Sequence, residues 1–316
     1  MDTKILIEVE QLYRYYGHHL AVDAISFELS QGEVLGFLGP NGAGKSTTMQ
    51  MITGNLAPSA GRITINGIDL LDRPRLAKAE IGYLPEQPPV YVDLTVDEYL
   101  LYCAKLHRVG SRQRGKAMAR AKQRCGLEQV SRRLIGNLSK GYQQRVGIAQ
   151  AILHDPTVVI LDEPTVGLDP NQIRDIRGLI RELGEHHGII LSTHILPEVQ
   201  ATCSRVQIIN RGKLVFSETM QALEKQLTSQ ILVLETRAPL NTDTLLQIDG
   251  VDNIETLTDH RVRLHFTGAN PAGTIAACVA TQEWGLVELA LDRQTLEQVF
   301  VDLTCSEQNT GNEVAA

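Results

Sequence analysis

The chain has 316 residues, 43% of them hydrophobic, and a formal net charge of −7. This length suggests roughly two domains, and the composition is that of a globular protein that can bury a sizeable core. The acidic balance argues against a protein whose main task is to bind nucleic acid through a basic surface, so no nucleic-acid partner is expected.

Neither a membrane span nor a secretory signal is predicted. No apolar run has the length that crosses a bilayer, and charges occur too early at the N-terminus for a signal peptide. The five cysteines include no C-x-x-C pair, which indicates neither disulfides nor zinc. We therefore expect a cytosolic chain.

Residues 4–29 are predicted to be rich in strand, because apolar and polar residues alternate on both sides of a turn at Gly17. Three tyrosines, Tyr13, Tyr15 and Tyr16, come just before this turn. A ring here could stack on a nucleotide base or pack inside a small sheet, and the position alone favours neither interpretation. Tyr16 is the best candidate for stacking.

The stretch Gly39–Thr47 fits the phosphate-binding pattern G-x-x-x-x-G-K-[ST]. It lies between an apolar, strand-like run at 34–38 and a segment, 47–52, that can continue as a helix. Glycines let backbone N–H groups approach phosphate oxygens, Lys45 can reach the terminal phosphates, and Ser46 can bind Mg²⁺. The residues predicted to bind nucleotide are Gly39, Pro40, Asn41, Gly42, Ala43, Gly44, Lys45, Ser46 and Thr47.

A helical insert is predicted after a strand that ends at Pro85 and is followed by Glu86 and Gln87. Thr95 begins the pattern T-x-x-E, a capping box that predicts a helix through about Leu106. The next part, 108–133, is rich in Arg and Lys. We interpret it as a solvated helix face, with a surface for acidic lipid headgroups or a partner as the alternative.

Ser139 and Gly141 lie at the start of another amphipathic helix. The Ser139 hydroxyl and the free N–H groups beside flexible Gly141 could bind a second phosphate, or Ser139 could be a plain helix cap. Asp169 stands before a helix predicted from about 171 to 183, which it can cap in the same way.

Acidic and imidazole side chains follow two further apolar strands. The strand at 158–161 leads into Asp162 and Glu163, an arrangement that places one acid on Mg²⁺ and the next near an attacking water. A strand at 189–193 delivers His194 at its carboxyl end, the edge where open α/β sheets collect active-site residues.

The order of these pieces resembles the ATP-binding subunit of an ABC transporter over residues 4 to about 225. GPNGAGKST resembles the Walker A motif, LSKGYQQ the signature, ILDEP Walker B, GLDP the D-loop and STH the switch-histidine motif. Two departures stand out. The signature is commonly LSGGQ, and the glutamine-loop position falls by spacing on Glu86, with Gln87 one place later, so both stay candidates.

The resemblance implies roles for named residues. Catalytic roles are implied for Glu163, His194, Lys45, Glu86 and Gln87, and Mg²⁺ ligation for Ser46 and Asp162 together with Glu86 or Gln87. Nucleotide contacts are implied for the Walker A residues and for Tyr16, Ser139, Gly141 and Asp169. The cofactors are then ATP and Mg²⁺.

The resemblance also implies an architecture: an α/β P-loop NTPase domain of the ABC type over 1–225, with its helical insert at about 88–137. Two such domains pair head to tail, each supplying Ser139 and Gly141 to the other's Walker A. We expect a homodimer, or pairing with a sister subunit, on integral membrane permease subunits at the cytoplasmic face of the membrane. The signature and the C-terminal extension look like those of exporters, including gliding-motility-like relatives. The alternative is a soluble ABC-type ATPase that remodels ribosome or DNA complexes.

The composition changes from about residue 226, and no catalytic motif recurs. Predicted strands and helices follow the order βαββαβ, a ferredoxin-like pattern, which indicates a small α+β accessory domain over 226–305. A further helix is predicted at 295–303, with Leu296, Val299, Phe300 and Leu303 on one face, and a disordered tail at 306–316.

Overall fold

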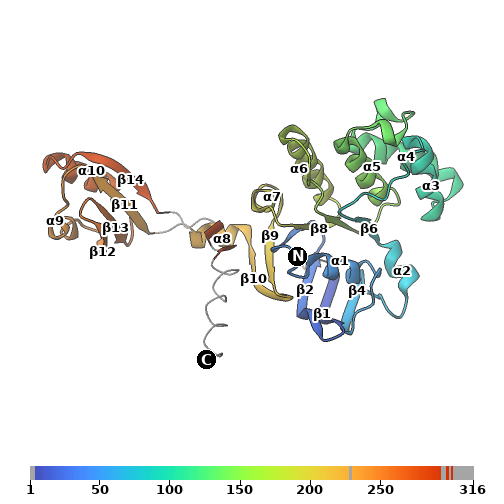
Figure 1. Cartoon of the computed structure of the whole chain (residues 1–316), viewed down its shortest axis with the longest axis horizontal. Coiled ribbons are helices and arrows are strands. Elements are labelled where there is room, and N and C mark those ends of the chain that lie inside the picture. The colour runs from blue at the N-terminus through green and yellow to red at the C-terminus, as the bar shows by residue number, and fades with distance from the viewer. Residues whose placement is uncertain (1–3, 228–229, 293–296, 299, 302–316) are drawn as a thin grey trace. The chain divides into compact units, whose positions relative to one another are not determined.

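The computed structural model describes residues 4–227, 230–292, 297–298 and 300–301. The chain divides into two compact units, the first ending at Met220 and the second beginning at Gln221 (Figure 1). The first unit contains two sheets and the second contains one, and each unit has its own apolar core. The predicted helix at 295–303 lies largely outside the described residues, and the predicted tail at 306–316 lies wholly outside them.

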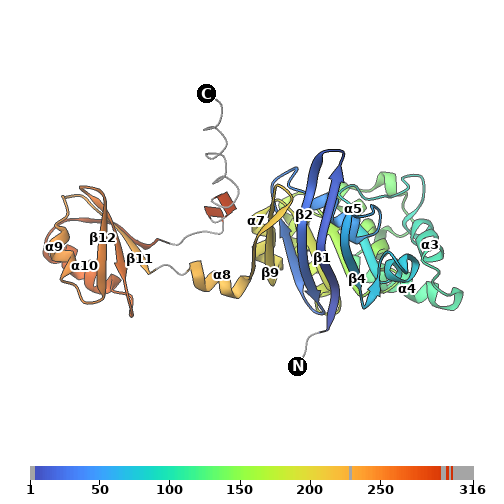
Figure 2. The same ribbon diagram turned by 90° about the horizontal axis from the view of Figure 1, so that it is seen from below.

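The first unit contains an antiparallel sheet with the strand order β2-β1-β4-β5 (Figure 2). The alternating pattern around Gly17 forms a long hairpin, and all three tyrosines of the predicted cluster lie on its first strand. The strands are β1 (Ile5–Tyr16), β2 (His19–Ser30), β4 (Ala60–Ile65) and β5 (Ile68–Asp69).

A second sheet of the same unit has the order β10-β9-β3-β8-β7-β6. Its strands run parallel except at the β9–β10 edge. The central strands are buried along their whole length, as their unbroken apolar sequences predict for a sheet covered on both faces. The strands are β3 (Val34–Leu38), β6 (Ile81–Leu84), β7 (Val158–Asp162), β8 (Gly188–Thr193), β9 (Arg205–Asn210) and β10 (Lys213–Thr219).

Three helices of this unit, α3, α5 and α6, begin at a residue whose side chain caps them. Thr95 caps its helix by a complete capping box: its hydroxyl accepts from Glu98 N at 3.3 Å, and Thr95 N donates to the Glu98 carboxylate at 2.8 Å. The prediction of a helix from Thr95 through Leu106 is thus confirmed. The helices are α1 (Lys45–Ile52), α2 (Pro74–Ala79), α3 (Val96–Leu106), α4 (Ser111–Cys125), α5 (Lys140–Ile152), α6 (Pro170–Gly184) and α7 (Leu196–Thr202). A further helix, α8 (Met220–Leu227), begins at the last residue of the first unit.

The core of the first unit joins the two sheets. Phe27 of β2 and Phe37 of β3 meet with their ring centroids 5.9 Å apart, and both are buried. Burying one such side chain contributes about 1.5–3 kcal/mol. This packing fixes the hairpin against the parallel sheet. The position of Tyr16 relative to the carboxyl ends of β3, β7 and β8 is thereby fixed as well.

The second unit is a four-stranded antiparallel sheet with the order β12-β13-β11-β14. Its elements follow the predicted order βαββαβ. Its core includes Leu232, Leu264, Phe266 and Ile275. The elements are β11 (Ile231–Thr236), α9 (Thr242–Leu246), β12 (Val251–Thr258), β13 (Arg261–Phe266), α10 (Ala272–Thr281) and β14 (Leu286–Leu291).

Candidate functional site

The loop between β3 and α1 requires glycine at two positions. Gly44 has φ +107° and is the N-cap of α1, and a Cβ there would lie 2.7 Å from Ala21 O. A Cβ at Gly39 would collide with the backbone oxygen of Ile209. Because Gly44 turns the chain so tightly, α1 begins at Lys45, two residues earlier than predicted, and the free N–H groups of its first turn face the loop.

This loop borders a cavity of about 600 Å³ at the carboxyl edge of the parallel sheet. Parallel strands end at the same edge, so segments far apart in sequence meet here. The lining residues are Tyr16, His19, Ala21, Asn41, Gly42, Gly44, Lys45, Ser46, Thr47, Glu86, Glu163, Val166 and His194.

Lys45 is 6% exposed and is held by oxygen atoms on several sides. Its ammonium donates to Gly39 O at 2.7 Å and to Pro40 O at 3.2 Å, and it lies 3.8 Å from Glu163 Oε1. Burial lowers the pKa of Lys45, against the opposing effect of the Glu163, Asp162 and Glu86 carboxylates. A nearly buried cation is therefore held beside the loop, which is what a bound phosphate requires.

Asp162 ends β7, is 3% exposed, and has one oxygen, Oδ1, without a hydrogen-bond partner in the described part of the chain. Burial raises the pKa of Asp162, and the Ser192 and Ser46 hydroxyls oppose this rise. An unsatisfied buried carboxylate oxygen costs about 1–3 kcal/mol or more unless a cation binds it. Oxygen ligands of this kind, with the neighbouring Ser46 hydroxyl, fit Mg²⁺.

Glu163 follows directly and has φ +49°, a left-handed conformation that non-glycine residues rarely adopt. Its backbone N–H donates to Ser192 O at 2.8 Å. Its carboxylate lies 2.9 Å from His194 Nδ1 and accepts from Thr193 Oγ1 at 3.2 Å. The strained backbone thus directs a carboxylate into the cavity beside the imidazole, where it can accept a proton.

Comparison with known proteins identifies the family. The sequence model described as ABC transporter matches residues 22–166. The linearmycin resistance ATP-binding protein LnrL of Bacillus subtilis is 30% identical over 95% of this chain and 98% of its own length. The bacitracin transport ATP-binding protein BcrA of Bacillus licheniformis is 38% identical over 70% of this chain and 72% of its own. The chain belongs to the ABC transporter ATP-binding proteins.

A solved structure described as the ATP-binding subunit of an ABC transporter is 32% identical, with a TM-score of 0.64, over 70% of this chain and 92% of its own. The chain is accordingly an ATP-binding and ATP-hydrolysing subunit of a transporter. The α/β P-loop fold implied by the sequence resemblance is confirmed. Within the described residues, no helix is long and apolar enough to cross a membrane.

In this ABC protein Tyr16 is 46% exposed and lines the cavity. The Arg14 guanidinium carbon lies 4.7 Å from the centroid of its ring, so one face of the ring is already occupied by a cation. The ring is therefore oriented by Arg14, and its other face is the one available to a nucleotide base.

The two glutamine-loop candidates differ in position. Glu86 lines the cavity, and its charge acts on both Lys45 and Asp162. Gln87 is not among the lining residues. The residue that the spacing selects is the one that reaches the cavity, although it carries a carboxylate rather than an amide.

Ser139, Gly141 and Asp169 do not line the cavity of their own chain. Ser139 caps α5 by accepting from Tyr142 N at 3.4 Å, and Asp169 caps α6 by accepting from two backbone N–H groups at 3.0 Å each. Both residues therefore cap helices, and the structure does not decide between a plain cap and a phosphate contact for Ser139. The nucleotide contacts expected for Ser139 and Gly141 stay predictions.

Glu198 also belongs to the site, although none of the sequence motifs indicated it. It lies on α7, is 1% exposed, and accepts hydrogen bonds from Thr165 Oγ1 and, at 3.2 Å, from Thr193 Oγ1. Burial raises the pKa of Glu198, and the two threonine hydroxyls oppose this rise. One buried carboxyl thus connects the segment after Glu163 with the strand end before His194.

Proposed function

We propose that this ATPase subunit powers export through separate membrane-spanning subunits, and that Glu163 is its general base. The carboxylate accepts a proton from the water that attacks the terminal phosphorus, and the bond to ADP breaks. His194 holds the Glu163 carboxylate, Lys45 compensates the phosphate charge, and Tyr16 stacks on the base. The observation that carries the proposal is the meeting of Lys45, Glu163 and His194 in one cavity.

The bound nucleotide is proposed to carry Mg²⁺, held by Ser46 and Asp162 with Glu86 as a further oxygen ligand. Support comes from the unsatisfied Asp162 Oδ1 and from the place of Glu86 on the cavity wall. Mg²⁺ would supply charge compensation at the phosphates. Gln87 is the alternative ligand, and it would need to turn inward.

A composite dimer is proposed because Ser139, Gly141 and Asp169 stand outside the cavity of their own chain. In a head-to-tail homodimer, or in a pair with a sister subunit, the capped start of α5 would present Ser139 and Gly141 to the phosphates bound by the partner. Each site would then be completed only when two chains meet.

Export and a peripheral position at the cytoplasmic face of the membrane are proposed from the relatives. LnrL is named for linearmycin resistance and BcrA for bacitracin transport, and both names suit removal of a toxic compound from the cell. Integral membrane permease subunits are the proposed partners, and nucleic acid is not. The segment 226–305 is proposed to be an accessory domain; the alignment with LnrL extends through it.

Glu163→Gln tests the assignment of the base. The amide keeps the shape of the side chain but cannot accept the proton, so we expect ATP binding to persist while turnover falls roughly 100- to 10,000-fold. Glu185→Gln, an exposed site at the end of α6, is the matched control and should leave turnover unchanged. Light scattering with and without ATP should show dimers of Glu163→Gln only with ATP. A variant that hydrolyses ATP normally would refute the role of Glu163.

Copurification from solubilised membranes tests the transport assignment. The chain should be recovered with an integral membrane protein. Recovery with ribosomes or DNA-bound complexes, and never with a membrane subunit, would support the soluble alternative instead.

A further inference from the structure

Lys140 is the first residue of α5, and it stands where the signature of the family commonly has glycine. Its side chain is exposed and makes no hydrogen bond or ion pair with any residue that the structure describes. A cation at the start of a helix is disfavoured, because the helix dipole makes this end positive. The first turn of α5 contains no acidic residue that would offset this charge. Lys140 therefore carries an uncompensated charge.

The Lys140 side chain lies against the D-loop of its own chain. A Cβ at Gly167 would collide with the Lys140 ammonium. The next residue of α5 lies equally close to α6, since a Cβ at Gly141 would be 2.6 Å from Gln172 Cδ. The starts of α5 and α6 thus form one surface, which carries Ser139 and Lys140 side by side. The Lys140 ammonium belongs to this surface and does not line the nucleotide cavity of its own chain.

The nucleotide cavity contains more negative than positive groups. Lys45 is the one Lys or Arg among its lining residues, against the carboxylates of Glu86 and Glu163, and Asp162 is buried beside them. A bound triphosphate adds several negative charges, and Mg²⁺ compensates only part of them. Glu86 adds to this imbalance, because the spacing places its carboxylate where the glutamine loop has a neutral amide.

We propose that Lys140 and Glu86 form a charge-compensating pair across the composite site. The Lys140 ammonium of one copy binds the terminal phosphate held by a second copy, and it offsets the Glu86 carboxylate of that copy. The two departures from the pattern of the family then balance, one adding a negative charge and the other a positive charge. The pair rests on the proposed composite dimer, in which Ser139 and Gly141, the neighbours of Lys140, contact the same phosphates.

Dilution of the ATP-bound dimer tests the pair in full-length chains that carry Glu163→Gln, so that ATP is bound but not turned over. The background is compared with the same chain carrying Lys140→Met, Glu86→Gln, or both. Methionine keeps nearly the length of the lysine side chain and removes its charge. Light scattering at saturating ATP and Mg²⁺ gives the dissociation constant of each dimer.

Lys140→Met should weaken the dimer about 10-fold for each site, and roughly 100-fold for the two sites together, because each loses a charge-assisted contact. In chains with Glu86→Gln the same change should cost only about 10-fold in total, since the carboxylate that the lysine compensates is absent. Lys140→Arg keeps the charge and should stay within about threefold of the background.

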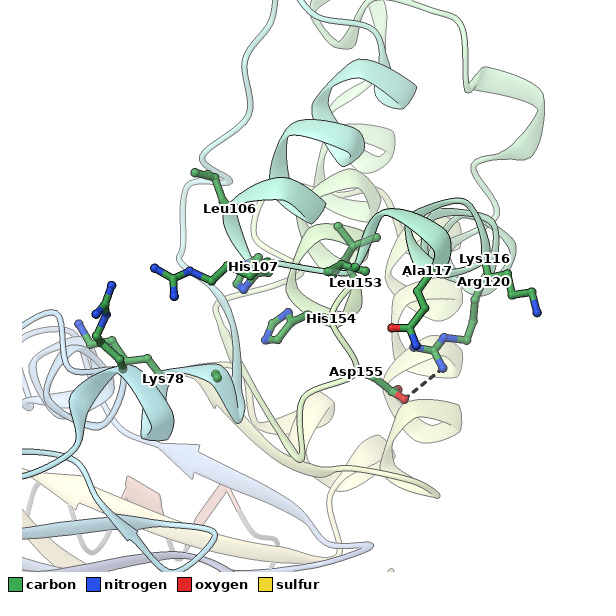
Figure 3. A pocket seen from close by; sticks show the side chains of 15 residues that line it. Lys78, Leu106, His107, Lys116, Ala117, Arg120, Leu153, His154 and Asp155 are labelled. Atoms are coloured by element: carbon green, nitrogen blue, oxygen red, sulfur yellow. Dashed lines mark hydrogen bonds and ion pairs between the residues drawn. The ribbon is translucent and has the colours of Figure 1, made fainter.

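The matched control is Lys116→Met on α4. Figure 3 shows Lys116 among the residues of a different pocket, none of which lines the nucleotide cavity. This control should stay within about threefold of the background, because an isolated surface charge is screened. The proposed pair is overturned by an equal loss in the control, by no loss in Lys140→Met, or by a loss that is the same with and without the Glu86 carboxylate. If the background itself forms no dimer with ATP, the composite dimer is wrong and the pair with it.

The nucleotide affinity of the dilute monomer shows which chain Lys140 serves. Lys140→Met should leave the affinity for a fluorescent ATP analogue unchanged, because Lys140 does not line the cavity of its own chain. A loss as large as that of the dimer would place Lys140 at its own nucleotide and overturn the assignment to a second copy. Thermal unfolding should also be unchanged, since the Ser139 cap of α5 does not involve the Lys140 side chain.

Discussion

The buried carboxyls of Glu163 and Glu198 share one hydrogen-bond donor, the hydroxyl of Thr193, which lies 3.2 Å from each of them. A hydroxyl has one proton and donates to one acceptor at a time. Burial raises the pKa of the Glu198 carboxyl, which also accepts from Thr165 Oγ1. Thr193 therefore links Glu198 to Glu163, the residue proposed as the base.

Glu198 is therefore expected to position the site without touching nucleotide. Glu198→Ala removes the acceptor for Thr165 and the partner of Thr193, so kcat for ATP should fall about 10-fold or more while KM changes little. Glu198→Gln should restore most of the rate, because its amide donates to Thr193 and its carbonyl accepts from Thr165. Steady-state kinetics of both variants check this.

The contrast between the two Glu198 variants decides what Glu198 does. If glutamine is as inactive as alanine, the acid itself is needed, and the hydrogen-bond account is wrong. If both variants keep full kcat and lose only thermal stability, Glu198 is merely structural. Loss of its buried hydrogen bonds should in any case cost about 1–3 kcal/mol of unfolding free energy in Glu198→Ala.

The raised pKa of Glu198 predicts how stability depends on pH. A carboxyl whose folded pKa lies above its unfolded value, 4.5 in the reference state, contributes stability that is complete below that value. The contribution is lost as pH rises through the higher folded pKa. The unsubstituted protein should thus lose stability relative to Glu198→Gln as pH increases above about 4.5. Denaturant unfolding of both proteins across this range measures the difference, and parallel curves would contradict the assignment.

Lys45→Ala should act on binding rather than on the proton transfer. The ammonium is the buried cation of the cavity, and a hydrogen bond to a charged group contributes about 1.5–3 kcal/mol, so ATP affinity should fall roughly 10- to 100-fold. Lys105→Ala, at an exposed position on α3, is the control. Fluorescent-nucleotide titration distinguishes the two, and normal affinity in Lys45→Ala would show that Lys45 does not contact phosphate.

Local patterns predicted the parts of the site that depend on neighbouring residues. The phosphate loop could be predicted from sequence because Gly44, with φ +107°, turns the chain within the loop itself. The caps at Thr95, Ser139 and Asp169 are set within three residues, which is why each of them was found.

Contacts between residues far apart in the sequence could not be predicted from such local patterns. Glu198 gains its partners only when α7 packs against the ends of β7 and β8. Glu86 and Gln87 are adjacent in sequence, and only the turn after β6 decides which of them lines the cavity.

Because the chain divides into two units with separate cores, we expect the first unit to fold and bind ATP without the second. A chain ended after Lys225 keeps the two sheets and the core around Phe27 and Phe37, so it should stay soluble and bind ATP with near-normal affinity. In the full chain, Leu264→Asp should disrupt only the second core and leave ATP affinity unchanged. Nucleotide titration and thermal unfolding of both proteins measure this. If instead the second unit completes the core of the first, the shortened chain exposes apolar surface and aggregates, and Leu264→Asp loses ATP binding as well.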